Sequence, residues 1–189
     1  MTLRVAIVLL TCASAQTAPP SVTDEQVDLA IGRAVQYLWS QQDEAGQWHD
    51  ARFDRMYPGG MTCLAAFALR TAGAGIGDVR LQKAVNVLLA TEGDIRSVYG
   101  RSFRLMLWAS LDPQKYRKPF KADVRFLTGL QNRHGAWGYG HVGVRVIPRD
   151  WSDASNSQLA ILALWTANQF GGEVGRKIWE RAEESWLQS

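Results

Sequence analysis

Three side chains in the second half of the chain are candidates for acid–base chemistry. Asp150 and Asp153 stand before a predicted helix, and His141 lies in the loop that leads into it, residues 138–151. Carboxylates and imidazoles are the groups that most often move protons in enzymes. The alternative role is structural, because the macrodipole favours an aspartate just before a helix N-terminus. His141 has no carboxylate at a fixed spacing, which favours a structural role for it as well.

The other reactive side chains favour structural roles. Cys63 falls one residue inside a predicted apolar helix, where a small buried hydrophobic residue is expected. His49 and His134 fall in polar loops, where we expect them to be solvated. None of the Cys, His and Asp residues has the spacing of metal ligands, and no Ser-His-Asp arrangement is visible. Gly73-x-Gly75-x-Gly77 has no preceding strand that would make it a phosphate loop. We therefore expect no metal and no cofactor.

Composition limits the partners of the chain. Its 189 residues are 47% hydrophobic and 21% charged, which is typical of a globular protein and excludes a disordered one. The net charge is only +3 and the basic residues are scattered, so no nucleic-acid partner is indicated. The apolar run near the N-terminus, Val5–Leu10, is far shorter than the roughly 20 residues of a transmembrane segment.

Residues 1–15 have the pattern of a short secretory signal peptide. Arg4 supplies a positive charge, residues 5–13 are apolar, and Ala13-Ser14-Ala15 is a small-x-small cleavage pattern. Residues 16–22 contain Pro19 and Pro20 and are expected to form a linker. The pattern predicts a secreted or periplasmic protein. The alternative is an apolar N-terminal helix that packs on the domain.

The chain contains an internal repeat. Residues 42–48 and residues 131–137 share the pattern Q-x-x-x-G-x-W at an offset of 89 residues. The match extends upstream, where Tyr37-Leu38 corresponds to Phe126-Leu127, and downstream, where residues 62–69 match residues 157–164. The repeat unit is therefore a helix, a Q-x-x-x-G-x-W turn, a loop and a second helix.

Local signals place the helices of each pair. A capping box at Thr23-x-x-Gln26 opens the first helix, and a second apolar helix is expected at about 62–71. A degenerate copy begins at 84–88 and has its partner helix at 102–111. A second capping box, Ser155-x-x-Gln158, predicts a helix that runs to about Phe170. With a further helix from Glu173, residues 23–189 form three helix pairs and the first helix of a fourth.

That last helix suggests a continuation of the repeat. Trp186-Leu187 corresponds to Tyr37-Leu38, which stands five residues before the motif glutamine. Repeat arrays usually end in a polar capping unit, whereas this helix carries Trp179 and Trp186. We therefore expect the sequence to be the N-terminal part of a longer protein. The alternative is that this helix closes the domain.

Each motif residue has a physical role in the turn. The glycine permits a positive φ after the helix, the glutamine amide can satisfy backbone groups at a neighbouring helix end, and the tryptophan buries a large apolar face. The motif is therefore expected to join helices and not to catalyse. Its residues are Gln42, Gly46, Trp48, Gln131, Gly135 and Trp137.

From about Thr23 to Ser189 the chain resembles the squalene–hopene cyclase and protein-prenyltransferase superfamily, whose QW repeats have this spacing. The resemblance implies an all-α fold, here an incomplete α/α toroid built from helix-pair repeats. It implies that the six motif residues are structural. It says little about chemistry, because the motif is not catalytic in that superfamily.

The resemblance also implies a test for cyclase activity. Squalene–hopene cyclases protonate an alkene with an aspartate of a D-x-D-D-T-A motif. Residues 153–158 align with that motif, and its acidic pair becomes Ser155-Asn156, neither of which can supply the proton. A register shifted by two residues would place Asp153 on the proton donor, at the expense of the helix match.

Three functions stay open at this point. The first is an exported, non-catalytic toroid protein whose partner is an apolar small molecule or the other domains of a longer chain. The second is a class II terpene cyclase of the squalene–hopene type. The third is an enzyme of the polysaccharide lyase kind, because helical toroids serve that chemistry too.

Overall fold

The computed structural model describes residues 22–91, 93–142, 145–146 and 150–188. Its helices are α1 (Asp24–Ser40), α2 (Ala51–Met56), α3 (Gly60–Thr71), α4 (Val79–Ala90), α5 (Val98–Leu111), α6 (Arg117–Leu130), α7 (Ala154–Gln169) and α8 (Arg176–Leu187). Two antiparallel strands of two residues each, β1 (His141–Val142) and β2 (Arg145–Val146), form a small hairpin. The all-α expectation is confirmed. The signal peptide predicted at 1–15 and most of the linker predicted at 16–22 lie outside the described residues.

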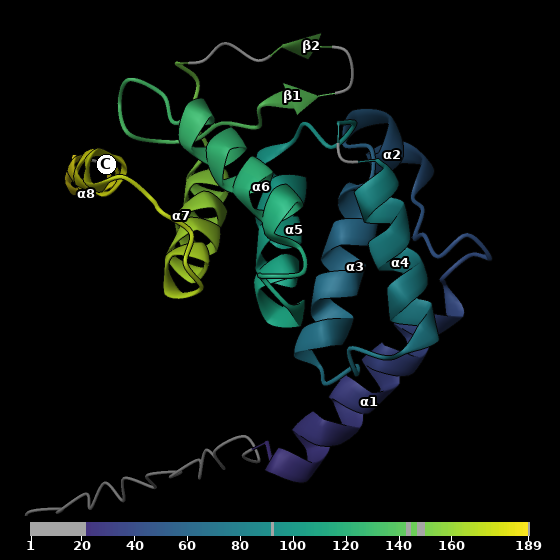
Figure 1. Cartoon of the computed structure of the whole chain (residues 1–189). Helices are drawn as coiled ribbons and strands as arrows, with labels where there is room; N and C mark the ends of the chain where they lie inside the picture. The colour runs from purple at the N-terminus through teal and green to yellow at the C-terminus, as the bar shows by residue number, and fades with distance from the viewer. Residues whose placement is uncertain (1–21, 92, 143–144, 147–149, 189) are drawn as a thin grey trace, which may run out of the picture.

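The helices alternate between two rows. α3, α5 and α7 lie next to one another, with α5 in the middle, and we call them the inner row (Figure 1). α4 packs on α3, α6 packs on both α5 and α7, and α1 packs on α3. The core lies between the rows: Leu69, Leu105, Trp108 and Leu164 are fully buried. α1, α4 and α6 make up the second row.

Helix ends differ from the sequence-based expectations in several places. The capping box at Thr23 is present, but the one predicted at Ser155 is wrong. α7 begins at Ala154, because the Asp153 carboxylate accepts the backbone N–H of Asn156 at 2.9 Å and so acts as the N-cap. α3, α5 and α8 begin at residues 60, 98 and 176, not at 62, 102 and 173, and α2 was not expected.

A buried ion network joins α5 to α6. Asp123 of α6 is fully buried and accepts charge-assisted hydrogen bonds from Arg101 at 2.6 Å and from Arg104 at 2.6 and 2.9 Å. The Trp108 indole N–H donates to the same carboxylate at 3.1 Å. Because Arg101, Arg104 and Trp108 recur at helical spacing on one face of α5, this carboxylate fixes how α6 lies on the inner row.

None of the helices in the described part of the chain has the length and apolar character needed to cross a bilayer.

Candidate functional site: an aromatic cavity at the start of the inner helices

The two Q-x-x-x-G-x-W turns make the same contacts. The Gln42 amide donates to the carbonyls of Gly46 at 3.1 Å and of Arg80, in α4, at 2.9 Å. The Gln131 amide donates to Gly135 at 3.0 Å and to Ile178, in α8, at 2.9 Å. Each turn is thereby tied to the first helix of the next pair.

The tryptophans and glycines complete the turns. The Trp48 indole donates to the Leu38 carbonyl at 2.7 Å, and the Trp137 indole donates to that of Leu127 at 2.7 Å. Gly46 and Gly135 have φ of 95° and 82°. A Cβ on Gly46 would lie 2.8 Å from a backbone carbon of α4, and one on Gly135 would overlap the backbone of α8. These positions therefore require glycine for both conformation and close approach.

A hydroxyl group links each turn to the inner helix of its own repeat. Thr62 Oγ1 accepts the Trp48 backbone N–H at 3.2 Å, and Ser157 Oγ accepts that of Trp137 at 2.9 Å. The motif itself does not include these hydroxyls. The signal that could have identified them is their equivalence at the head of the aligned segments 62–69 and 157–164.

The structure gives the three candidate catalytic residues separate positions. Asp150 is exposed and pairs with Arg133, with 3.1 Å between the Arg133 Nε and a carboxylate oxygen. Asp153 caps α7. His141 opens β1, and its side chain lies outside the part of the chain that the structure describes.

Asp153 is surrounded by hydrogen-bond donors. The Ser155 hydroxyl donates to one carboxylate oxygen, the Asn156 side-chain amide donates at 3.0 Å, and the Tyr139 hydroxyl donates at 3.4 Å. The hydrogen bond from Ser155 is the main reason why the pKa of Asp153 is lowered, and it outweighs the opposing effect of burial. Asp153 is therefore ionised at neutral pH, and an ionised carboxylate cannot protonate an alkene.

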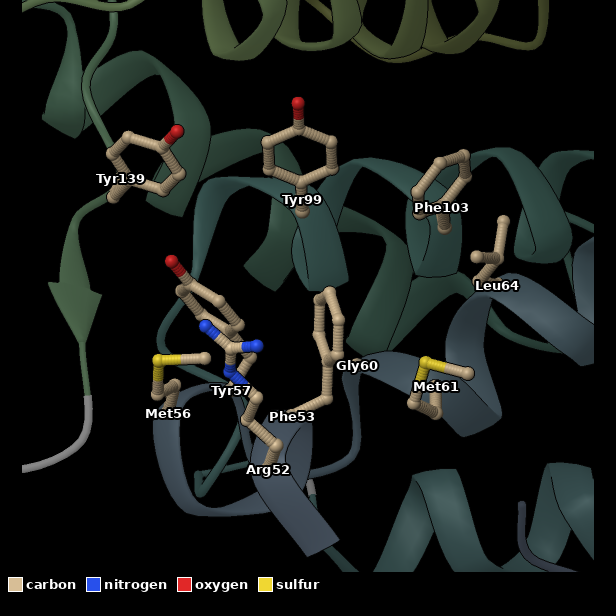
Figure 2. A pocket seen from close by; sticks show the side chains of 10 residues that line it. All are labelled: Arg52, Phe53, Met56, Tyr57, Gly60, Met61, Leu64, Tyr99, Phe103 and Tyr139. Carbon is tan, nitrogen blue, oxygen red and sulfur yellow. The ribbon is translucent and has the colours of Figure 1, made fainter. Parts of the chain in front are cut away.

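A cavity of about 510 Å³ lies beside these groups, where α2 covers the first turns of α3 and α5 (Figure 2). The residues that line it are Arg52, Phe53, Met56, Tyr57, Gly60, Met61, Leu64, Tyr99, Phe103 and Tyr139. Five of these side chains are aromatic, and only one carries a charge. Its volume is in the range of pockets that bind small organic ligands.

The cavity's tyrosines form a stacked series. The rings of Tyr57 and Tyr139 are 6.1 Å apart between centroids, those of Tyr99 and Tyr139 are 6.3 Å apart, and Trp151 stacks on Tyr139 at 5.6 Å. In Figure 2 the Tyr99 hydroxyl points away from Phe53 and Met61, and it donates to Ser155 at 2.6 Å. The cavity is therefore bounded by ring faces, while the hydroxyls of Tyr99 and Tyr139 are directed at the start of α7.

The ionisable groups of the site are poor bases and nucleophiles. Burial raises the pKa of Tyr57 and of Tyr139, so both phenols are protonated at neutral pH. Cys63 is fully buried, which raises its thiol pKa to about 12. Among the described residues no group of three or more His, Cys, Asp or Glu side chains could hold a metal ion. The arrangement is suited to binding apolar surface.

The cavity was not predicted from the sequence, because Tyr57, Tyr99 and Tyr139 come from three separate segments. The available signal was that each of them stands close to the start of an inner helix or in the loop that leads to one. No family model, no curated protein and no solved structure matches this chain.

Proposed function

We propose that this chain is a non-catalytic protein that binds an apolar small molecule in the cavity between α2, α3, α5 and Tyr139. The observation that carries the proposal is the lining: nine of the ten residues are uncharged, and five present aromatic rings. Aromatic side chains bury large apolar areas at a small cost in conformational entropy, and so dominate the energetics of such sites.

The protonation states of the site support binding over chemistry. An ionised Asp153 and neutral tyrosines with raised pKa values offer neither a strong acid nor a ready base. A squalene–hopene type of cyclisation would need a protonated carboxyl group at Asp153. The ionised Asp153 instead accepts hydrogen bonds from Tyr139 and Ser155, and Ser155 accepts one from Tyr99, so that these groups hold the two tyrosine rings in place.

We further propose that the two helix rows are part of an α/α toroid like that of the cyclase and prenyltransferase superfamily, in an exported protein. Alternating rows and two equivalent Q-x-x-x-G-x-W turns support the architecture. The signal-peptide pattern in residues 1–15 supports export. Mass spectrometry of the protein recovered from a secreting host tests export. Loss of the first fifteen residues supports export, and an intact N-terminus in the cytoplasm contradicts it.

Binding is tested with Nile red, a neutral dye whose emission rises in apolar surroundings. We expect saturable binding to the wild type, displaced by dodecanol. Leu64→Trp places a larger side chain in the cavity and should weaken binding about tenfold or more. Leu162→Trp is the matched control, because Leu162 is exposed to a similar extent, 45% against 40% for Leu64, but does not line the cavity. Equal dye binding by wild type and both variants would overturn the proposal.

A further inference from the structure

Arg52 is the one charged side chain among the ten that line the cavity. It lies in the first turn of α2, and its exposed guanidinium stands at the boundary between the aromatic lining and solvent. In Figure 2 it is drawn in the same part of the cavity as Tyr57 and Met56, whereas Leu64 and Met61 are drawn on the other side. The cavity thus has a cationic end and an apolar end.

The two carboxylates nearest to Arg52 in the chain, Asp50 and Asp54, bind other groups. Asp50 accepts the backbone N–H groups of Arg52 at 2.9 Å and Phe53 at 2.8 Å, as the N-cap of α2. Asp54 contacts His49 Nδ1 at 2.9 Å and the Asp50 backbone N–H at 3.2 Å. Within the described ranges no carboxylate forms an ion pair with Arg52. Its charge is therefore available to a bound molecule.

Tyr57 adds a second donor at the same end. It is the C-cap of α2, five residues after Arg52, and its side chain also lines the cavity. The Tyr57 phenol stays protonated at neutral pH and can donate a hydrogen bond. Each N–H of the Arg52 guanidinium can also donate, and the guanidinium has no atom that accepts hydrogen bonds. A pair of donors, one of them cationic, favours an anionic oxygen group.

We propose that the ligand of this cavity is an amphipathic acid: an apolar body that lies against the aromatic rings, and a carboxylate that pairs with Arg52 and Tyr57. This proposal rests on the proposed apolar-ligand function. The carboxylate lies near solvent, where desolvation costs it little, while the body of the molecule is removed from water. A cationic or neutral head group would lose the ion pair.

Calorimetric titration of the full chain with dodecanoate, dodecanol and dodecylamine tests the head group, because the three share one apolar chain. We expect dodecanoate to bind about tenfold more tightly than dodecanol, the gain of one exposed charge-assisted contact. Dodecylamine should bind more weakly than dodecanol. In Arg52→Met the preference for dodecanoate should disappear, while the affinity for dodecanol stays within about twofold of that of the wild type.

Arg55→Met is the matched control, because Arg55 lies in the same helix and is exposed but does not line the cavity. This variant should keep the preference, which excludes a general effect of net charge. Thermal unfolding curves of both variants should overlay that of the wild type. Equal binding of dodecanoate and dodecanol, a preference for dodecylamine, or an Arg52→Met variant that keeps the preference would each overturn the acid proposal alone. Failure of all three ligands to bind would overturn the proposed function with it.

Discussion

At the residue scale, each Q-x-x-x-G-x-W turn is held by three polar groups with fixed partners: an amide, an indole and the hydroxyl of Thr62 or Ser157. Trp48 is 4% exposed and Trp137 is fully buried, and each donates to the carbonyl found ten residues before it. Each tryptophan therefore satisfies a carbonyl near the end of the preceding helix and fills space between the two rows of helices. Loss of the ring would remove both contributions.

We predict that Trp48→Ala and Trp137→Ala each lower the free energy of unfolding by about 3 kcal/mol or more. Chemical denaturation of the two variants measures this. Trp165→Ala is the control, since Trp165 is 56% exposed and should cost much less. Unfolding free energies close to that of the wild type would show that the turns do not hold the helices together.

The second prediction at this scale concerns Asp123, the buried carboxylate that contacts both Arg101 and Arg104. Asp123→Asn keeps the shape but removes the charge, which leaves two buried guanidinium groups without it. We expect a loss of about 3–5 kcal/mol in unfolding free energy. Asp150→Asn breaks only an exposed pair, and its effect in the same denaturation experiment should be below about 1 kcal/mol.

At the scale of elements, α2 depends on a histidine bridge. His49 Nε2 lies 3.0 Å from Asp43, in the first Q-x-x-x-G-x-W turn, and His49 Nδ1 lies 2.9 Å from Asp54, in α2. Only the protonated imidazole can donate to both carboxylates at once. The hydrogen bond that His49 donates to Asp54 is the main reason why the pKa of His49 is raised. The bridge therefore holds one wall of the cavity in place.

The stability that this bridge contributes should depend on pH. A raised folded-state pKa means that the contribution is complete below the ordinary histidine pKa, about 6.5, and is lost as the pH rises through the raised value. His49→Gln should therefore melt below the wild type at about pH 5 and close to it at about pH 9. Because His49 is largely exposed, the difference should stay below about 1 kcal/mol and shrink in salt. A gap between the two melting temperatures that widens with rising pH would contradict the bridge.

At the scale of the whole molecule, apolar side chains are exposed at both ends of the helix rows. Leu29 and Ile31 of α1 are 55% and 46% exposed, and Trp186 and Leu187 of α8 are 49% and 81% exposed. Exposed apolar patches commonly mark surfaces that associate. In Figure 1 α1 extends past the end of α3, and α8 stands beyond α7.

We therefore predict that the 189-residue chain self-associates with rising concentration. Light scattering across a dilution series measures the mass. Leu187→Lys and Ile31→Lys should each reduce association, whereas Lys115→Ala, at an exposed position between α5 and α6, should leave it unchanged. A monomeric mass at every concentration, with no binding of an apolar dye outside the cavity, would contradict this prediction.

The sequence alone determined the helical content, the position of the two turns and the burial of Cys63. These features follow from signals within a few residues: hydrophobic periodicity, a capping box at Thr23, and a glycine four residues after a glutamine. The toroid, the export signal and the structural role of the motif remain predictions. The start of α7 was predicted wrongly because Asp153 and Ser155 compete for the same cap, and sequence spacing does not show which one the backbone meets.

Only the tertiary structure decided the rest. The Arg104–Asp123 pair joins residues 19 apart, and the Tyr99–Ser155 hydrogen bond joins residues 56 apart, so neither has a local pattern that could predict it. The cavity exists because α2, an element that the loop sequence did not predict, covers the start of the inner row. Local propensity places helices, but the packing of distant segments brings Tyr57, Tyr99 and Tyr139 together and leaves Arg52 beside them.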